Sequence, residues 1–128
     1  MKLLLDTATF LHAALEPKKL SARAAKLLLD PENERYLSVV SSWEIAIKYS
    51  LGKLRLPNGP GHFIPTHREH MGATILPLDE ESVFHVTRLP HLHRDPFDRI
   101  LISQAIVHGM SLLTSDPEMS RYPVRTEW

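Results

Sequence analysis

A chain of 128 residues, 43% of them hydrophobic, is long enough for one core and too short for two, so we expect a single domain over residues 1–128. It contains no cysteine, which excludes disulfides, thiolate zinc sites and cysteine nucleophiles. Its 15 basic and 15 acidic residues give zero formal net charge, so no overall positive field attracts nucleic acid, and such a partner must be held locally.

The first residues lack the apolar length of a signal peptide or a membrane span. Lys2 precedes a very short apolar run that Asp6 interrupts, whereas a spanning helix needs about 20 apolar residues. We therefore expect a cytoplasmic protein with no membrane partner. Two groups of basic residues could face phosphates locally, although a solvated surface explains any one of them: Lys48, Lys53 and Arg55, and Arg88, Arg94 and Arg99.

Strands and helices are expected to alternate along the first half of the chain. Lys2–Leu5 has no polar alternation, as in a central parallel strand covered on both faces, and Asp6 follows it directly. The elements expected next are helices at Thr7–Leu15 and Ser21–Leu29, a strand at Tyr36–Val40, and a helix at Trp43–Leu51 that Gly52 ends.

The second half continues the alternation after a turn at residues 57–61. We expect helices at His62–Met71 and Asp79–Arg88 around a strand at Thr74–Leu76, then a helix from Asp95 to about His108, a strand at Ser111–Thr114 and a final short strand that includes Val124. This order predicts an α/β fold with a mostly parallel sheet, in which ligands lie beyond the carboxyl ends of the strands.

Four acidic residues lie where these elements begin or end: Asp6, Glu44, Asp98 and Asp116. Each has a structural explanation. Asp6 could cap a helix, Glu44 could form a capping box with Ser41 or an ion pair with Lys48, and Asp98 could favour the helix dipole. Asp95-Pro96 and Asp116-Pro117 also have the form of helix caps, which makes Asp98 a better metal ligand than Asp95.

The four acids together are harder to explain by capping alone. Carboxylates brought together repel one another unless a divalent cation neutralises them, and oxygen-rich sites suit Mg²⁺ or Mn²⁺. Such a cation polarises a phosphodiester and lowers the pKa of a bound water. The sequence therefore favours metal-dependent hydrolysis of RNA or DNA, with Glu44 a candidate general base.

These acids lie in segments that resemble PIN-domain ribonucleases, specifically the VapC toxins of bacterial type II toxin–antitoxin modules. The resemblance covers essentially the whole chain, in order and with compatible spacing. Its motifs are Leu4-Leu5-Asp6-Thr7, Ser42-Trp43-Glu44-Ile45-Ala46-Ile47-Lys48 with Gly52-Lys53-Leu54, Arg94-Asp95-Pro96-Phe97-Asp98-Arg99 with Gln104-Ala105, and Thr114-Ser115-Asp116.

The resemblance implies a PIN-like three-layer α/β/α sandwich and a Mg²⁺- or Mn²⁺-dependent endoribonuclease that cuts tRNA, rRNA or mRNA and so inhibits translation and growth. It also implies a homodimer and a hetero-oligomer with a VapB-like or other small antitoxin. The acidic quartet carries over onto Asp6, Glu44, Asp98 and Asp116. We expect Asp6 and Asp98 to bind one metal directly, and Glu44 and Asp116 to act through water or at a second metal.

Three further residues match the family motifs as supporting groups. Thr114 matches the hydroxyl residue before the last acid, where the resemblance implies that it orients a ligand or water. Asp95 and Arg99 match an extended motif that holds the acids or contacts phosphate. One departure concerns the first motif, where many relatives have histidine and tryptophan and this chain reads Asp6-Thr7-Ala8-Thr9-Phe10-Leu11-His12.

Other functions remain open from the residues alone. A histidine-bound zinc hydrolase is suggested by eight histidines, but their spacing matches no standard zinc signature: His62, His67, His70, His91 and His93 are the relevant ones. A phosphatase with an aspartyl nucleophile usually has a second acid two residues later, where this chain has Ala8. The principal alternative is a catalytically silent PIN-like module that binds RNA or protein and regulates.

Overall fold

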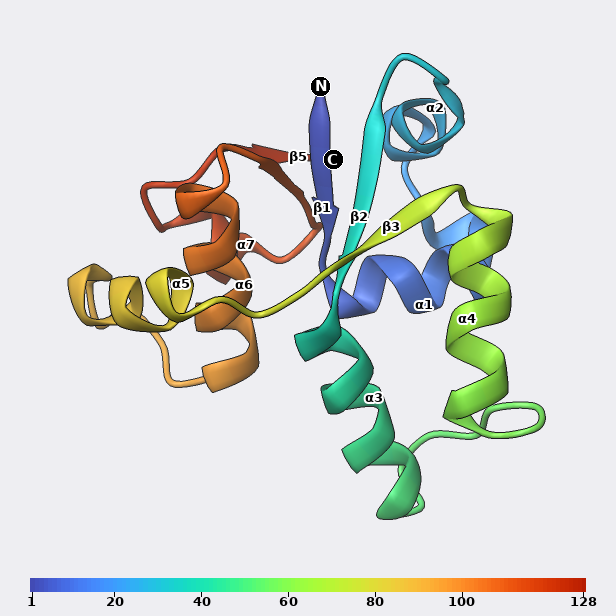
Figure 1. The fold of residues 1–128 in the computed structure, drawn as a ribbon. Coiled ribbons are helices and arrows are strands. Elements are labelled where there is room, and N and C mark those ends of the chain that lie inside the picture. Colours follow the sequence, from blue (N-terminus) through green and yellow to red (C-terminus); the bar gives the residue numbers. More distant parts are fainter.

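The computed structural model describes all residues 1–128 and contains one parallel five-stranded sheet with the strand order β3-β2-β1-β4-β5 (Figure 1). All four strand pairings are parallel. The strands are β1 (Lys2–Leu5), β2 (Glu34–Ser38), β3 (Ala73–Leu76), β4 (Ser111–Leu113) and β5 (Thr126–Glu127). The predicted mostly parallel sheet is therefore confirmed.

Helices cover the sheet on both faces, as the predicted three-layer sandwich requires. Figure 1 shows α5, α6 and α7 on one side of β1 and α1, α2 and α4 on the other. The helices are α1 (Thr7–Leu15), η1 (Pro17–Lys19), α2 (Ala22–Leu29), α3 (Val39–Ser50), α4 (Pro60–His70), α5 (Glu80–His85), η2 (Val86–Arg88), α6 (Pro96–Val107) and α7 (Pro117–Ser120). None of them is long and apolar enough to cross a membrane.

The central strand β1 contributes to both hydrophobic cores. Leu4 packs in the cluster that includes Leu101 and Leu112, whereas Leu5 packs in the cluster that includes Phe10 and Leu37. All of these side chains are at most 1% exposed. Successive strand residues point to opposite faces, so an uninterrupted apolar run fits a strand that is covered on both sides.

The carboxyl ends of β1 and β4 meet at one edge of the sheet, where Leu5 pairs with Leu113. Asp6 and Thr114 follow these two residues directly, and the backbone N–H of Asp6 donates to the Leu113 carbonyl at 3.2 Å. On the other side of β1, Leu5 pairs with Leu37 of β2. The polypeptide continues from β2 directly into α3. The fold thus brings segments that are distant in sequence to the same edge.

The predicted boundary between β2 and α3 is wrong by several residues. The strand ends at Ser38 and not at Val40, and Ser38 is the N-cap of α3, with its hydroxyl accepting from the Val40 N–H at 3.0 Å. The predicted capping box of Ser41 and Glu44 is therefore also wrong. The β-branched pair at 39 and 40 favours a strand locally, but Val40 is buried in the core as a helical residue, and packing overrides propensity.

Smaller differences between the predicted and the observed elements concern β5, the turn before α4, and α7. The final strand begins at Thr126 and leaves Val124 outside it, because Val124 packs against the core and β5 pairs with β4 through Thr126. The predicted turn ends early, since Gly59 caps α4 and Pro60 is its first residue. The helix α7 was not among the predicted elements, although Asp116-Pro117 had the form of a helix cap. Gly52, with a φ of +72°, ends α3 as expected.

Candidate active site

All four predicted acids line one cavity of about 260 Å³ beyond the carboxyl ends of the strands. They come from four different elements, because Asp6 precedes α1, Glu44 lies in α3, Asp98 lies in α6 and Asp116 precedes α7. The remaining residues that line the cavity are Thr7, Ala8, Leu11, Lys48, Asp95 and Ser115.

Asp6 is the most firmly held of the four. The residue is 5% exposed, and its Oδ1 accepts from the Thr9 N–H at 2.8 Å, which caps α1. Its Oδ2 accepts from the Thr114 hydroxyl at 2.5 Å. Burial raises the pKa of Asp6, while the hydrogen bonds from Thr114 and Thr9 oppose that rise. Asp6 is thus both a helix cap and a buried, oriented oxygen donor.

Thr114 joins two of the acids through one hydroxyl group. It donates to Asp6 and accepts the backbone N–H of Asp116 at 3.0 Å. The side chain is 3% exposed, so water cannot easily replace these bonds. Thr114 therefore orients the carboxylate of Asp6 and the backbone at Asp116.

We expect Thr114→Val to weaken Mn²⁺ binding about 10- to 100-fold, because Asp6 loses the bond that favours its ionised form. Titration of metal-free protein with Mn²⁺ measures this effect. Thr114→Ser is the matched control, since it keeps the hydroxyl, and its affinity should stay close to that of the wild type. Equal affinities in the wild type and the valine variant would contradict this role.

Glu44 is buried, and only one of its two carboxylate oxygens has a hydrogen-bond partner. Its Oε2 accepts from the ammonium of Lys48 at 2.7 Å, so the ion pair predicted from the sequence is present. Its Oε1 is buried and has no hydrogen-bond partner. An unpaired buried carboxylate oxygen is costly, and it favours a ligand that can supply a proton or a positive charge.

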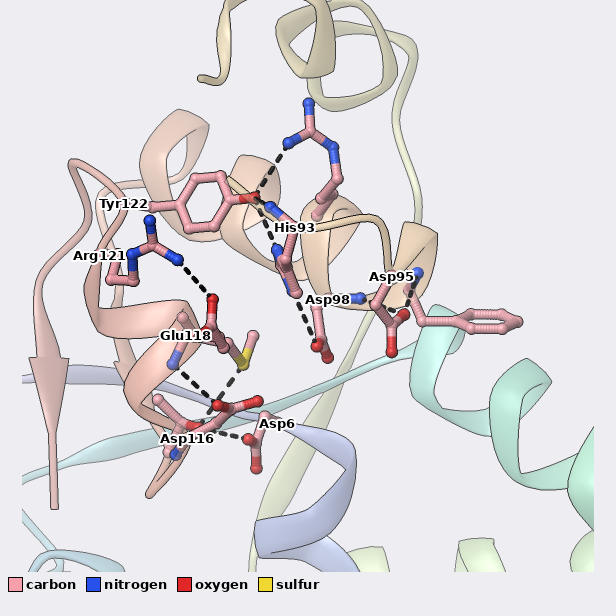
Figure 2. Close-up of polar contacts among 12 residues, drawn as sticks. Asp6, His93, Asp95, Asp98, Asp116, Glu118, Arg121 and Tyr122 are labelled. Carbon is pink, nitrogen blue, oxygen red and sulfur yellow. Dashed lines mark hydrogen bonds and ion pairs between the residues drawn. The ribbon is translucent and has the colours of Figure 1, made fainter. Parts of the chain in front are cut away.

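Asp98 lies in the first turn of α6 and faces His93, whose Nε2 is 3.2 Å from the Asp98 Oδ2 (Figure 2). The Nδ1 of the same ring is 2.7 Å from the Tyr122 hydroxyl. Burial raises the pKa of Asp98 to about 6; the hydrogen bond with His93 opposes this rise, and the charges of Asp95 and Asp116 add to it. Without a metal, the ionised form of Asp98 is therefore energetically unfavourable in the folded protein.

Asp95 and Asp116 serve as helix caps, as their Asp-Pro sequences predict. Asp95 accepts from the N–H of Phe97 at 2.9 Å and of Asp98 at 3.2 Å. Asp116 accepts from the N–H of Glu118 at 2.9 Å. Both side chains also line the cavity. Each of these two acids therefore caps a helix and also lines the cavity.

Arg99 lies outside this cavity, in contrast to Asp95. The residue is 8% exposed, and its guanidinium donates to the carbonyl of Pro90 at 2.8 Å and to the Tyr122 hydroxyl at 3.0 Å. It thus fixes the segment that carries His93. Tyr122 was not predicted as a site residue, because 29 residues separate it from His93 and no local pattern links them.

No three acidic or histidine side chains of the chain stand close enough together to hold a metal ion without rearrangement. Even so, the residues fit Mg²⁺ or Mn²⁺. Every acid that lines the cavity offers oxygen donors, Glu44 has an oxygen without a partner, and two acids have raised pKa values. Mg²⁺ usually binds through one or two carboxylates and completes its shell with water and substrate phosphate.

The histidines of α4 do not form an alternative metal site. The rings of His67 and His70 are 5.9 Å apart between centroids, and the first packs against Phe63 at 4.3 Å. Burial lowers the pKa of His67, and the charges of His70 and His62 lower it further. They belong to no metal-binding group. This arrangement gives no support to the zinc hydrolase.

Comparisons with known proteins point to one family. The family model described as the PIN domain matches residues 3–124. Ribonuclease VapC16 of Mycobacterium tuberculosis (strain ATCC 25618 / H37Rv) is 36% identical over 59 residues, which are 46% of this chain and 42% of that protein. The matched segment thus spans less than half of that relative.

Solved structures share the fold over nearly the whole chain. A chain of VapBC2 from Rickettsia felis, bound to a DNA fragment from its promoter, has a TM-score of 0.75 with 19% identity, over 100% of this chain and 99% of that chain. A chain of DNA-bound VapBC from Salmonella typhimurium has a TM-score of 0.70 with 17% identity, over 99% and 97%. At such identities these matches show the fold alone.

Proposed function

Because this chain belongs to the PIN domain family, we propose that it is a Mg²⁺- or Mn²⁺-dependent endoribonuclease and the toxin of a type II toxin–antitoxin module. One observation carries the proposal. Four carboxylates from four separate elements line a single cavity, and a buried oxygen of Glu44 there has no partner. Capping and ion pairing do not account for that oxygen.

The chemistry follows from the positions of these side chains. Asp6 and Asp98 would hold the cation, with Glu44 and Asp116 acting through water or at a second metal. A bound divalent cation would neutralise charge on the phosphate and lower the pKa of a coordinated water. Thr114 and Thr9 keep the carboxylate of Asp6 in one orientation.

Glu44 is the candidate general base, because it lines the cavity and its Oε1, which is buried in the metal-free structure, has no hydrogen-bond partner. Lys48 holds the other oxygen at 2.7 Å and so fixes the orientation of the carboxylate. Attack of water on phosphorus with cleavage of the P–O3′ bond would leave a 5′-phosphate on one fragment and a 3′-hydroxyl on the other. The Glu44 proton would then return to solvent or to the 3′ oxygen.

Similarity to known proteins supports the proposed toxin role and the proposed partners. The partly matched relative is named a ribonuclease, and the solved structures with the same fold include VapBC pairs and a toxin–antitoxin complex from Klebsiella pneumoniae. We therefore propose a small VapB-like or other antitoxin as the protein partner, a homodimer as the free form, and tRNA, rRNA or mRNA as the substrate. A cytoplasmic location is part of the same proposal.

The test is to incubate EDTA-stripped protein with total bacterial RNA, with and without Mg²⁺ or Mn²⁺. We expect discrete fragments with 5′-phosphate ends only when metal is present, because the acids alone cannot neutralise the phosphate. Fragments that form equally in EDTA would contradict metal dependence. Intact RNA under all conditions, with folded protein that binds metal, would favour the silent binding module instead.

A further inference from the structure

A second, larger cavity of about 530 Å³ lies beside the acidic one and has the opposite charge. We call it the basic cavity, and His91, Leu92, His93, Arg94 and Arg99 line it. His93 belongs to its wall and also contacts Asp98 of the acidic cavity at 3.2 Å, as Figure 2 shows. The two cavities are therefore next to each other, with one imidazole between them.

Arg99 is buried in this wall without a carboxylate partner. No acid lies within 4.0 Å of its guanidinium. Its acceptors are all neutral: the carbonyls of Pro90 and, at 3.5 Å, Val86, and the hydroxyl of Tyr122. Buried arginines are rarely left unpaired, because removing the charge from water is costly.

The guanidinium also has unused donors. Of its five N–H groups, the Nη1 atom uses two and Nη2 uses one, which leaves Nε–H and one Nη2–H without a protein acceptor. The Nε has no protein acceptor and is not fully buried. Two adjacent N–H donors are the arrangement that receives phosphate oxygens.

Arg94 provides the second positive charge of the basic cavity. It is exposed and forms no ion pair, even though Asp95 is its neighbour in sequence. The chain as a whole has no net charge, so this local charge is not part of a general positive surface. An anion beside an acidic cavity needs such a local anchor, because the carboxylates repel it.

We propose that the basic cavity binds a backbone phosphate of the RNA, close to the phosphodiester that the acidic cavity receives. The inference rests on the proposed function and adds to it the place where the strand is anchored. RNA fits this site because its phosphates recur along the strand, so one can occupy the basic cavity while a nearby one enters the acidic cavity. Neutralised phosphates dominate the affinity of proteins for nucleic acid.

The test is the binding of a fluorescein-labelled single-stranded RNA of about 12 nucleotides, followed by anisotropy in EDTA so that neither metal nor cleavage contributes. We expect Arg94→Ala to weaken binding about 3- to 10-fold and to reduce the slope of log Kd against log salt by about 0.7, as for one lost phosphate contact with a single strand. Arg99→Lys keeps the charge and loses the paired donors, so it should also weaken binding.

The control is Arg125→Ala, which removes an exposed arginine directly before β5, at the edge of the sheet opposite the two cavities; unlike Arg94, this arginine pairs with Glu127 at 3.3 Å. It should leave the affinity and the salt slope unchanged. Mn²⁺ titration of Arg94→Ala should match the wild type, which separates anchoring of RNA from damage to the metal site. Circular dichroism checks that Arg99→Lys is folded. If it is not, Arg94→Ala still tests the proposal, because Arg94 is exposed and its removal should not affect folding.

The two proposals fail in different ways. If RNA is cleaved but Arg94→Ala and folded Arg99→Lys bind RNA with the affinity and salt slope of the wild type, the phosphate site is wrong and the nuclease stands. If binding depends on Arg94 as expected but no metal condition gives cleavage, the phosphate site stands and the nuclease is wrong. A loss in Arg125→Ala as large as in Arg94→Ala would also overturn the phosphate site.

Discussion

Asp98→Asn is expected to reduce RNA cleavage at least about 100-fold, the upper end of what the loss of even an indirect metal partner costs. Asparagine keeps the shape of the side chain but removes the negative charge that would hold the cation. The fold should survive, because Asp95 and not Asp98 caps α6. Initial rates of RNA cleavage at saturating Mn²⁺, compared with the wild type, measure the loss.

The same substitution is expected to stabilise the metal-free protein above pH 6. The pKa of Asp98 rises from 3.8 to about 6 on folding, so its contribution to stability is greatest below about pH 4 and is lost as the pH rises to about 6. That pKa difference corresponds to roughly 3 kcal/mol, and we expect a gain of about 1 to 3 kcal/mol because asparagine also changes the contact with His93.

Urea unfolding in EDTA at pH 7.5 and at pH 4 distinguishes this effect from a general change in packing. The variant should be more stable than the wild type at pH 7.5. The difference should be much smaller at pH 4, where Asp98 is protonated in the folded state and, with a pKa of 3.8, only partly ionised in the unfolded state. Mn²⁺ should then stabilise the wild type and not the variant. A variant that cleaves RNA at the wild-type rate would contradict the role assigned to Asp98.

Leu4→Ala is expected to destabilise the protein by about 2 to 5 kcal/mol. Leu4 is fully buried in the central strand and packs in the same core as Leu101 and Leu112, so truncation removes apolar contacts and leaves a cavity. Total stabilities are about 5 to 15 kcal/mol, and the loss would therefore be a large part of the whole. Urea unfolding at pH 7.5 measures it.

Leu29→Ala is the matched control, because it is the same substitution at a side chain that is 82% exposed at the end of α2. Its effect should stay within about 0.5 kcal/mol. If the two variants lost similar amounts of stability, β1 would not be the buried central strand of the sheet. The position assigned to Asp6, at the carboxyl end of that strand, would then also be wrong.

The elements with clear local signals could be predicted from the sequence. Lys2–Leu5 and Thr7–Leu15 have their predicted bounds, because an apolar run and a helical pattern meet at an acid that caps the helix. The boundary at Ser38 could not be predicted, since the β-branched residues after it favour a strand and only tertiary packing makes them helical. Parallel pairing of β5 with β4 is likewise a long-range property.

The four acids of the candidate site and their local contacts, such as the Glu44–Lys48 ion pair, could be predicted from the sequence, but contacts between distant segments could not. Asp6, Glu44, Asp98 and Asp116 line one cavity, as their positions at the ends of elements suggested. The contact between His93 and Tyr122, and the turn of Arg99 away from the acids, depend on how loops fold against α6 and α7. No local pattern of residue types encodes such contacts, so only the structure reveals the basic cavity.

The most direct test of the metal centre is anomalous diffraction from a crystal of the protein soaked in Mn²⁺. We expect a manganese peak in the cavity that the four acids line, next to the carboxylates of Asp6 and Asp98. A peak only at the histidines of α4, or none in that cavity with its acids ordered and accessible, would contradict a metal-dependent active site at this edge of the sheet.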